Sequence, residues 1–274
     1  MKNVDNKTVF ITGGSSGIGL ATAKQLAAKG ANIVIFARKE DQLKVATAEI
    51  EQRAVNNGQK FNWLSMDVAD NTDIKVKLDQ AVAQFNIPDI FINCAGVSVA
   101  AKFEDISCDQ FDNLMRINVS GTRNAIAAIL PHMKKKKDGT IVIVASTAGL
   151  IPVYGYTAYG TSKYALVGLA ECLRTELKPE KINVLVLCPP EVDTPLVEEE
   201  EKTSPPETKV LKHLAGKLTA EAAAATLIRG IQKKRFMIIP GLMANILYFT
   251  QRFSPGFIFR GSSDFLVWMA QKRK

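Results

Sequence analysis

The sequence predicts an α/β fold with one doubly wound parallel sheet and helices on both of its faces. Short apolar runs rich in β-branched residues alternate with segments whose apolar residues recur at helical spacing. The runs are continuously apolar, as expected for parallel strands that are buried on both faces. A glycine-rich turn joins the first run to the first helical segment. No internal repeat and no domain linker is evident, so we expect a single domain of Rossmann type.

The elements follow in chain order. The expected strands are residues 8–11, 33–37, 89–93, 140–145 and 182–187, with 236–239 as the candidate for the last one. The first helix is expected over residues 17–29, ended by Gly30. Asn71 is expected to cap a later helix. Gly139 is expected to close the helix that carries the lysines at 134–137. The stretch from Val192 to Thr208 predicts a long polar loop, and we assign a substrate lid to residues 192–218.

Composition excludes several classes of protein. The chain has 274 residues, of which 47% are hydrophobic and 23% charged, as in ordinary globular proteins. Four cysteines without a CxxC pair and only two histidines predict no metal site and four buried free thiols. The net charge of +8 comes largely from short clusters without interleaved aromatic residues, so no nucleic-acid partner is expected. The polar N-terminus argues against secretion, and we expect a cytoplasmic protein.

A dinucleotide site is expected at the glycine-rich turn Thr12–Gly19. Glycines there let the backbone approach a pyrophosphate, and the helix N-terminus offers free N–H groups to its charge. The expected contacts of this turn are Gly13, Ser15, Ser16, Gly17, Ile18 and Gly19. The second strand is followed by Arg38 and Lys39, where an NAD site would need a carboxylate. A guanidinium suits the 2′-phosphate of NADPH, although an arginine exposed at a strand end would give the same pattern.

Catalytic residues are expected at the carboxyl end of the strand 140–145 and on the helix after it. Tyr159 and Lys163 are four residues apart, so they share one helical face. We expect the lysine charge to lower the pKa of the phenol. Ser146 follows the strand directly, and its hydroxyl could donate to a carbonyl oxygen on which negative charge develops.

These motifs resemble those of the short-chain dehydrogenase/reductase family over nearly the whole chain. The matching segments are TGGSSGIG, NCAG at 93–96, Asn118, Ser146 and Tyr159 with Lys163. The resemblance implies that Tyr159 is the general acid and that Lys163 binds the nicotinamide ribose. It implies that Ser146 orients the substrate carbonyl and that Asn118 shapes the helix holding a proton-relay water. It also implies a homo-oligomer, a dimer or tetramer. Further cofactor contacts implied by the resemblance are Asp67, Val68, Asn93, Ala95, Gly96, Pro189, Val192 and Thr194.

A narrower resemblance is to the 3-ketodihydrosphingosine reductases, a branch that acts in sphingolipid synthesis. It depends on the segments 102–105, 155–159 and 189–195, the last with Pro189-Pro190 where the wider family has Pro-Gly. It implies reduction of a lipid ketone by NADPH, in eukaryotes at the cytosolic face of the endoplasmic reticulum. A reductase for steroids, retinoids or 3-oxoacyl substrates remains open, as does a dinucleotide-sensing protein without catalysis. The acidic run Glu198–Glu201 could attract the substrate ammonium, but we favour a solvated charge run.

The last segment, residues 241–274, is apolar and basic. Aliphatic and aromatic residues from Leu242 to Trp268 are interrupted by Pro255, Gly256 and Gly261, so no span of about 20 apolar residues remains. We expect an interfacial segment with Arg260, Lys272, Arg273 and Lys274 facing anionic headgroups, hence a peripheral membrane contact. A tail packed on its own core or on a partner subunit is the alternative. Residues 1–240 then form the NADPH-binding domain.

Overall fold

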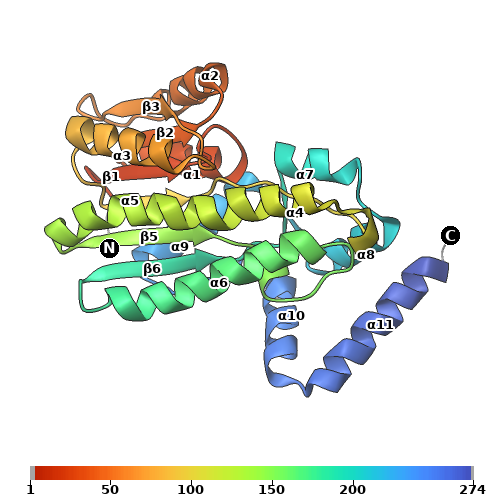
Figure 1. Cartoon of the computed structure of the whole chain (residues 1–274). Coiled ribbons are helices and arrows are strands. Elements are labelled where there is room, and N and C mark those ends of the chain that lie inside the picture. The colour runs from red at the N-terminus through yellow and green to blue at the C-terminus, as the bar shows by residue number, and fades with distance from the viewer. Residues whose placement is uncertain (1–3, 273–274) are drawn as a thin grey trace.

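The protein is built on a seven-stranded parallel sheet of strand order β3-β2-β1-β4-β5-β6-β9 (Figure 1). The computed structural model describes residues 4–272, except the side chains of residues 213–214, 258–259, 262–263 and 270. Arg273 and Lys274 of the predicted basic end therefore lie outside the described residues. The strands are β1 (Thr8–Thr12), β2 (Asn32–Ala37), β3 (Phe61–Ser65), β4 (Ile90–Asn93), β5 (Gly139–Val144), β6 (Ile182–Leu187) and β9 (Met237–Ile238).

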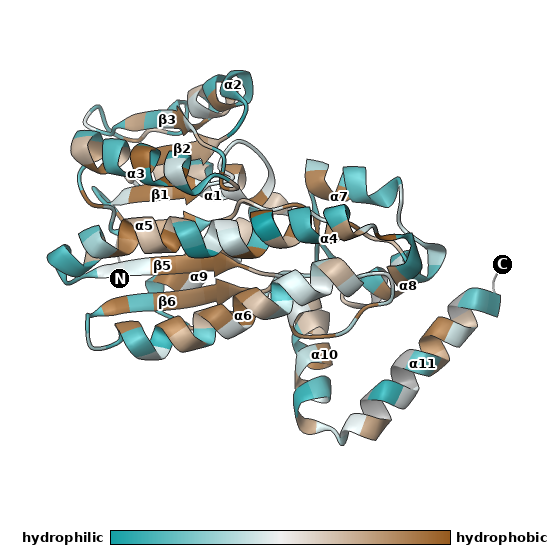
Figure 2. Ribbon diagram, viewed as in Figure 1, coloured by the Kyte–Doolittle hydropathy of each residue, from teal (hydrophilic) through white to brown (hydrophobic). Residues whose placement is uncertain are grey.

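Helices cover both faces of this sheet. One face carries α1 (Gly17–Ala27), α2 (Glu40–Glu51) and α9 (Ala220–Gln232), and the other carries α3 (Asn71–Phe85), α5 (Gly121–Lys136) and α6 (Thr157–Leu177). Neighbouring residues of β1 point into different cores: Phe10 packs with the second group of helices, Val9 and Ile11 with the first. Figure 2 shows the strands as apolar and the outer helix faces as polar. This confirms the predicted doubly wound fold.

Helix ends differ in detail from the sequence predictions. Asp70, not Asn71, caps α3, because its carboxylate accepts hydrogen bonds from the backbone N–H groups of Thr72 and Asp73. Lys137, in the left-handed conformation with φ 52°, closes α5, and Gly139 is the first residue of β5. The first helix ends at Ala27, before the predicted Lys29.

The stretch 192–218 is not a polar loop. It contains β7 (Glu191–Asp193), α7 (Pro195–Glu201), α8 (Pro206–Leu214) and β8 (Lys217–Thr219), and β7 pairs with β8 in parallel. Pro195 and Pro206 stand at the first position of their helices, where a proline loses no hydrogen bond and has the right φ angle. The prolines that indicated a loop are thus helix starts.

The C-terminal extension forms two helices, α10 (Leu242–Phe253) and α11 (Gly256–Lys272), that project from the sheet as a V (Figure 1). Ala244 is fully buried, Leu247 packs against the sheet's core, and α11 contacts α8. Gly261 lies within α11, and the apolar run from Leu242 to Trp268 is divided between the two helices at Ser254 and Pro255. Within residues 4–272, no helix has the length and hydropathy needed to cross a bilayer.

All four cysteines are free thiols, but two are not buried as predicted. Cys188 is buried and Cys94 partly so, whereas Cys108 and Cys172 are exposed. Cys108 begins the short helix α4 (Cys108–Met115), and Cys172 lies on the outer face of α6. The absence of metal-ligand spacing does not indicate which face of a helix a cysteine occupies.

Candidate active site

A cavity of about 350 Å³ lies at the carboxyl ends of the central strands. Its wall comes from the turns after β1, β4, β5 and β6, from α6, α7 and α8, and from the two C-terminal helices. The strand order reverses between β1 and β4, and such a reversal opens a crevice at the edge of a parallel sheet. The cavity thus occupies the place where ligands bind in this fold class.

Tyr159, Lys163 and Ser146 meet inside this cavity. Tyr159 and Lys163 lie one turn apart on α6, and the ammonium of Lys163 is 5.5 Å from the centre of the Tyr159 ring. Lys163 also donates a hydrogen bond to the Val144 carbonyl at 3.1 Å. Ser146 follows β5, accepts a hydrogen bond from the backbone N–H of Ala148 at 3.1 Å, and is hydrogen-bonded to the Tyr159 phenol. The phenol of Tyr159 and the hydroxyl of Ser146 therefore meet, and the Lys163 ammonium lies over the phenol ring.

The electrostatics of this group differ from the sequence prediction. Burial raises the pKa of Tyr159, the negative charge of Glu200 raises it further, and the hydrogen bond with Ser146 lowers it only in part. Burial lowers the pKa of Lys163 to about 8. The pKa of the Tyr159 phenol is therefore raised overall, not lowered as expected, because burial outweighs any stabilisation of the phenolate by Lys163. Lys163 lies over the ring face rather than beside the hydroxyl, and desolvation dominates. At neutral pH the phenol stays protonated.

Asn118 lies in a π-helical turn, Arg116–Ser120, between α4 and α5. Its side-chain oxygen accepts a hydrogen bond from the Val97 N–H at 2.8 Å. Its nitrogen donates to the Val97 carbonyl at 2.9 Å and to the Ser162 hydroxyl at 3.0 Å. Asn118 thereby fixes the chain after β4 to α6. Wide turns of this kind often occur at functional sites.

The glycine-rich turn has the shape that a dinucleotide needs. Gly13 has φ +66°, and a Cβ there would lie 2.7 Å from the backbone nitrogen of Ala95. Gly17 has φ +51°, and a Cβ there would lie 2.9 Å from a methyl carbon of Thr194. Ser16 stands at the N-cap of α1, yet its side chain makes no capping hydrogen bond. The first N–H groups of α1 are thus available to an anion. These residues fit a nicotinamide dinucleotide.

Four predicted cofactor contacts, after β2 and after β3, lie farther along the same edge of the sheet. Arg38 and Lys39 are exposed just beyond β2, and within the described residues neither makes an ion pair. An arginine with no carboxylate partner suits a phosphate. Asp67 follows β3 closely, and its carboxylate accepts a hydrogen bond from the Ala69 N–H at 2.9 Å. Val68 is buried, and its carbonyl packs against Gly121 of α5.

A family model described as short chain dehydrogenase matches residues 7–205. The chain belongs to this family. It is therefore an oxidoreductase.

The relatives of this short-chain dehydrogenase include enzymes with different substrates. A 3-dehydrosphinganine reductase of Danio rerio is 40% identical over 229 residues, which cover 83% of this chain and 69% of the relative. A fatty acyl-CoA reductase of Acinetobacter baylyi is 33% identical, covering 90% and 81% of the two chains. Among solved structures, levodione reductase has a TM-score of 0.81 at 22% identity and covers 89% of this chain and 99% of its own, which bears on the fold alone.

The structure brings many of the sequence-predicted residues to one cavity and leaves others outside it. Those in the cavity wall are Gly13, Ser16, Gly17, Ile18, Ala95, Gly96, Ser146, Tyr159, Lys163, Pro189, Val192 and Thr194. Those outside the wall are Ser15, Gly19, Arg38, Lys39, Asp67, Val68, Asn93 and Asn118. Asn93 was expected to line the cleft, but its side chain is 3% exposed and is held between the Thr12 hydroxyl and the Thr122 carbonyl. It connects β4 to its neighbours instead.

The residues of the cavity wall that were not predicted as site residues include Tyr156, Glu191, Glu200 and Lys212. Glu198, Glu199 and Glu201 are exposed, as a solvated charge run requires, but Glu200 is buried. Leu196 and Val197, one turn before Glu200 on α7, also line the cavity. Helical spacing from those two apolar residues could have singled out Glu200 within the acidic run.

Proposed function

We propose that the protein reduces 3-ketodihydrosphingosine to dihydrosphingosine with NADPH, as a step of sphingolipid biosynthesis. The observation that carries this proposal is a protonated Tyr159 hydrogen-bonded to Ser146 inside a largely apolar cavity. The 40% identity to a protein named 3-dehydrosphinganine reductase supports the choice of substrate.

The reaction needs a proton donor and a stabilised oxygen. NADPH, when bound, supplies the hydride that adds to the carbonyl carbon. Tyr159 gives its proton to the carbonyl oxygen, which becomes the hydroxyl of the alcohol. Ser146 donates a hydrogen bond to the same oxygen while charge develops on it. The ammonium of Lys163 stabilises the phenolate that Tyr159 leaves behind, and its depressed pKa of about 8 still leaves it charged at neutral pH.

The cofactor would be held along the edge of the sheet from β3 to β6. The turn Gly13–Gly19 and the N-terminus of α1 would bind the pyrophosphate, and Arg38 with Lys39 the 2′-phosphate. Asp67 and Val68 would lie beside the adenine. The residues that would surround the nicotinamide end are Ala95, Gly96, Lys163, Pro189, Val192 and Thr194. Residues 1–240 form the NADPH-binding domain in this proposal, and residues 192–218 cover the substrate.

The cavity also suits a long alkyl chain. Beyond the polar group its wall includes Val153, Leu211, Leu247 and Leu266, the last two from the C-terminal helices. Burial of each methylene of a chain against such a wall is worth about 0.8 kcal/mol. A lipid ketone therefore gains affinity from residues that the catalytic group does not need.

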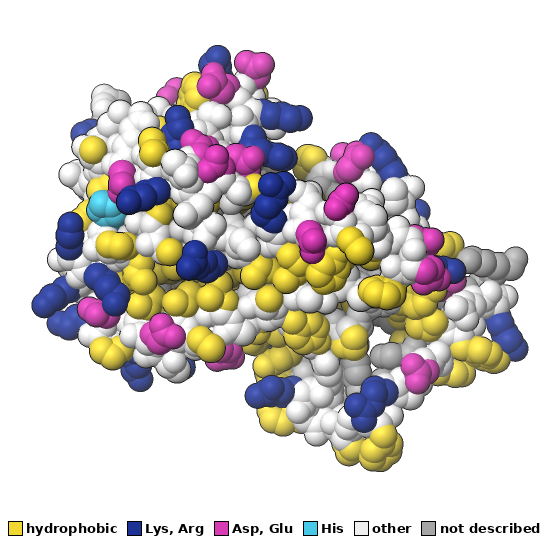
Figure 3. Space-filling model, viewed as in Figure 1, with side chains coloured by type: hydrophobic (Ala, Val, Ile, Leu, Met, Phe, Trp, Pro, Cys, Tyr) yellow, Lys and Arg dark blue, Asp and Glu magenta, His cyan; other side chains and the backbone are white. Residues whose placement is uncertain are grey.

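We further propose that the extension 241–274 lies on an anionic membrane, at the cytosolic face. Its exposed large apolar residues are Leu242, Met243, Ile246, Phe249, Phe253, Phe257, Phe265 and Trp268. Figure 3 shows apolar and basic side chains gathered on the part of the molecule formed by α10 and α11. Arg252, Arg260 and Lys272 lie among them, which suits anionic headgroups. Because the same helices line the cavity, the substrate could enter from the lipid. Self-association as a dimer or tetramer completes the proposal, and light scattering measures it.

A direct assay tests the proposed reaction. Purified protein is incubated with NADPH and 3-ketodihydrosphingosine, and dihydrosphingosine is measured by mass spectrometry. Steroid, retinoid, 3-oxoacyl and fatty acyl-CoA substrates are run beside it, the last because of the relative from Acinetobacter. We expect turnover of the sphingoid ketone above all others. Reduction of another carbonyl without formation of dihydrosphingosine would overturn the substrate, and NADPH binding without any turnover would favour a sensor.

A further inference from the structure

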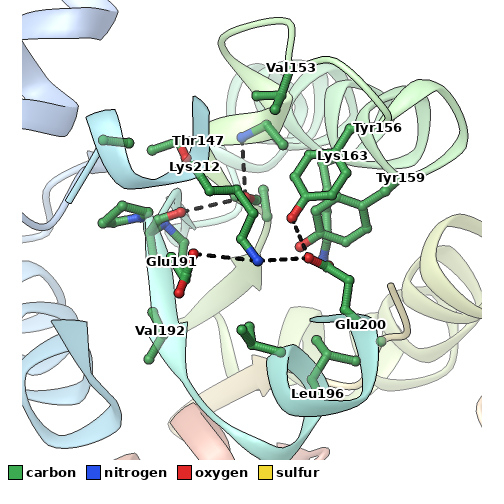
Figure 4. A pocket seen from close by; sticks show the side chains of 18 of the residues that line it. Thr147, Val153, Tyr156, Tyr159, Lys163, Glu191, Val192, Leu196, Glu200 and Lys212 are labelled. Atoms are coloured by element: carbon green, nitrogen blue, oxygen red, sulfur yellow. Dashed lines mark hydrogen bonds and ion pairs between the residues drawn. The ribbon is translucent and has the colours of Figure 1, made fainter. Parts of the chain in front are cut away.

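A buried ion cluster lies in the cavity on the substrate side of Tyr159 (Figure 4). The ammonium of Lys212, on α8, is 2.9 Å from one carboxylate oxygen of Glu200 on α7 and 3.4 Å from one of Glu191 on β7. The side chains of Glu191, Glu200 and Lys212 are 2%, 3% and 6% exposed. The cluster thus consists of two carboxylates that share one lysine, and all three side chains are buried.

The other partners of Glu200 are neutral donors. The Tyr156 hydroxyl donates to its carboxylate at 2.6 Å, and the Ser98 hydroxyl donates to the other oxygen. Burial and the charge of Glu200 raise the pKa of Tyr156, so this phenol contributes no charge. Burial lowers the pKa of Lys212, but the hydrogen bond to Glu200 and both carboxylates raise it more, so the lysine stays charged. The cluster therefore contains one carboxyl group more than it contains ammonium groups.

Glu191 has unused capacity for hydrogen bonds. Neither of its buried carboxylate oxygens accepts a well-aligned hydrogen bond within the described residues, and the Lys212 ammonium approaches one of them only to 3.4 Å. Its nearest cations are Lys212 and, at 3.8 Å, Lys217, which is half-exposed and paired with Asp193 at 2.7 Å. A buried carboxylate without hydrogen bonds is costly, as is an unbalanced buried charge. A cation with several N–H donors would supply the missing hydrogen bonds and balance the charge.

The cluster lies within reach of the catalytic group. Figure 4 shows the Tyr156 and Tyr159 hydroxyls pointing toward Glu200, and the charge of Glu200 is one cause of the raised pKa of Tyr159. Lys163, the fourth charged residue of the cavity's described wall, interacts with the Tyr159 ring and with the Val144 carbonyl rather than with these carboxylates. A cation bound by the cluster would therefore sit beside a carbonyl held by Tyr159.

We propose that Glu200 and Glu191 bind the ammonium group that the substrate carries on the carbon next to its ketone. This inference depends on the proposed reduction and deepens it, since it names the feature that selects 2-amino ketones. Lys212 acts as a positioning residue that keeps the two carboxylates together. The same negative charge disfavours anionic substrates such as coenzyme A thioesters and free oxo acids, which share the ketone or a related carbonyl but not the ammonium.

The test compares two substrates and three variants. The substrates are 3-ketodihydrosphingosine and the 1-hydroxy-3-ketone of equal chain length without the amino group. The variants are Glu200→Gln, Glu191→Gln and, as a matched control, Glu198→Gln, an exposed glutamate on the same helix. A charged hydrogen bond contributes enough that Glu200→Gln should lower kcat/KM for the amino ketone about 10- to 100-fold. Turnover of the analogue should change little, and Glu198→Gln should resemble the unchanged protein on both substrates.

The outcomes separate this inference from the proposed function. If Glu200→Gln lowers kcat/KM equally for both substrates, Glu200 only holds α7 in place. If kcat/KM falls for neither substrate, Glu200 does not bind the ammonium group. If Glu200→Gln does not fold, the test uses the unchanged protein instead. Its kcat/KM must then be higher for the amino ketone than for the analogue without an amino group and for the N-acetylated ketone, whose nitrogen is neutral. Equal turnover of these three overturns the ammonium site while leaving the reductase standing. Reduction of none of them overturns the reductase itself.

Discussion

The two ends of the cavity are built in different ways. The cofactor end consists largely of backbone: glycines at 13 and 17, the start of α1, and the turns after β4 and β5. The substrate end consists of side chains from β7, α7, α8, α10 and α11. The first needs a fixed backbone shape, which a few contiguous residues specify. The second needs a particular set of charges and apolar groups, which separate elements must bring together. The cofactor end can therefore stay the same among enzymes that use the same cofactor, while side chains at the substrate end change which substrate is bound.

The largest loss of activity is expected for a substitution of Tyr159, which lies between the cofactor end and the substrate end of the cavity. Replacing Tyr159 by Phe removes the proton donor but keeps the ring that lies under Lys163. We expect kcat to fall about 10²- to 10⁴-fold, the usual contribution of a positioned general acid. The dissociation constant of NADPH, measured by fluorescence titration, should stay within about twofold if cofactor and proton donor act separately. Near-normal turnover would remove Tyr159 from the mechanism.

The next effect belongs to the cofactor end alone. Replacing Arg38 by Asp exchanges a cation for an anion where the 2′-phosphate would lie. A charge-assisted hydrogen bond is worth about 1.5–3 kcal/mol, so kcat/KM for NADPH should fall about 10- to 100-fold. The value for NADH should rise, because an acidic residue there suits the ribose hydroxyls. Steady-state kinetics with both cofactors provide the measurement. An unchanged ratio would mean that another residue, with Lys39 the first to examine, recognises the phosphate.

A pH profile tests the electrostatics of the catalytic group. Burial lowers the pKa of Lys163 to about 8, so the residue is charged below that pH and loses its charge above it. The reductive kcat/KM should therefore be level near neutrality and then fall about tenfold per pH unit once Lys163 is neutral. The raised pKa of Tyr159 keeps the proton donor intact over the same range. Lys163→Arg, which retains its charge, should abolish the decline if the variant binds NADPH; a decline that persists would assign it to another group.

The smallest effect is expected at the surface of the substrate end. Phe253 and Phe257 are 76% and 72% exposed on either side of the turn between α10 and α11. Replacing both by Ser should weaken binding to phosphatidylcholine vesicles that contain phosphatidylserine by about tenfold, since an interfacial ring gains only a fraction of the roughly 1.5–3 kcal/mol that full burial contributes. Vesicle flotation measures this. Val55→Ser, an exposed apolar residue remote from the extension, is the control and should bind like the unchanged protein. Equal binding by all three would leave the extension without a membrane role.

The cofactor end of the cavity could be predicted from the sequence more fully than the substrate end. The doubly wound parallel sheet and the meeting of Ser146, Tyr159 and Lys163 could be predicted because the patterns that indicate them are short and local in the sequence. The character of the stretch 192–218 could not, since the prolines that indicate a loop also begin helices. The direction of the Tyr159 pKa was missed because desolvation depends on everything packed around the ring, including Glu200.

The sequence by itself determined the fold and the chemistry. Hydrophobic period and glycine spacing act over short distances along the chain, so they can be recognised without knowing what packs where. Only the tertiary structure decided which member of an acidic run is buried, and that Lys212 and Tyr156 face it. The burial and pairing of a charged side chain depend on which groups lie within a few ångströms of it in the folded protein. Those groups can come from any part of the sequence, so the order of residues does not reveal them.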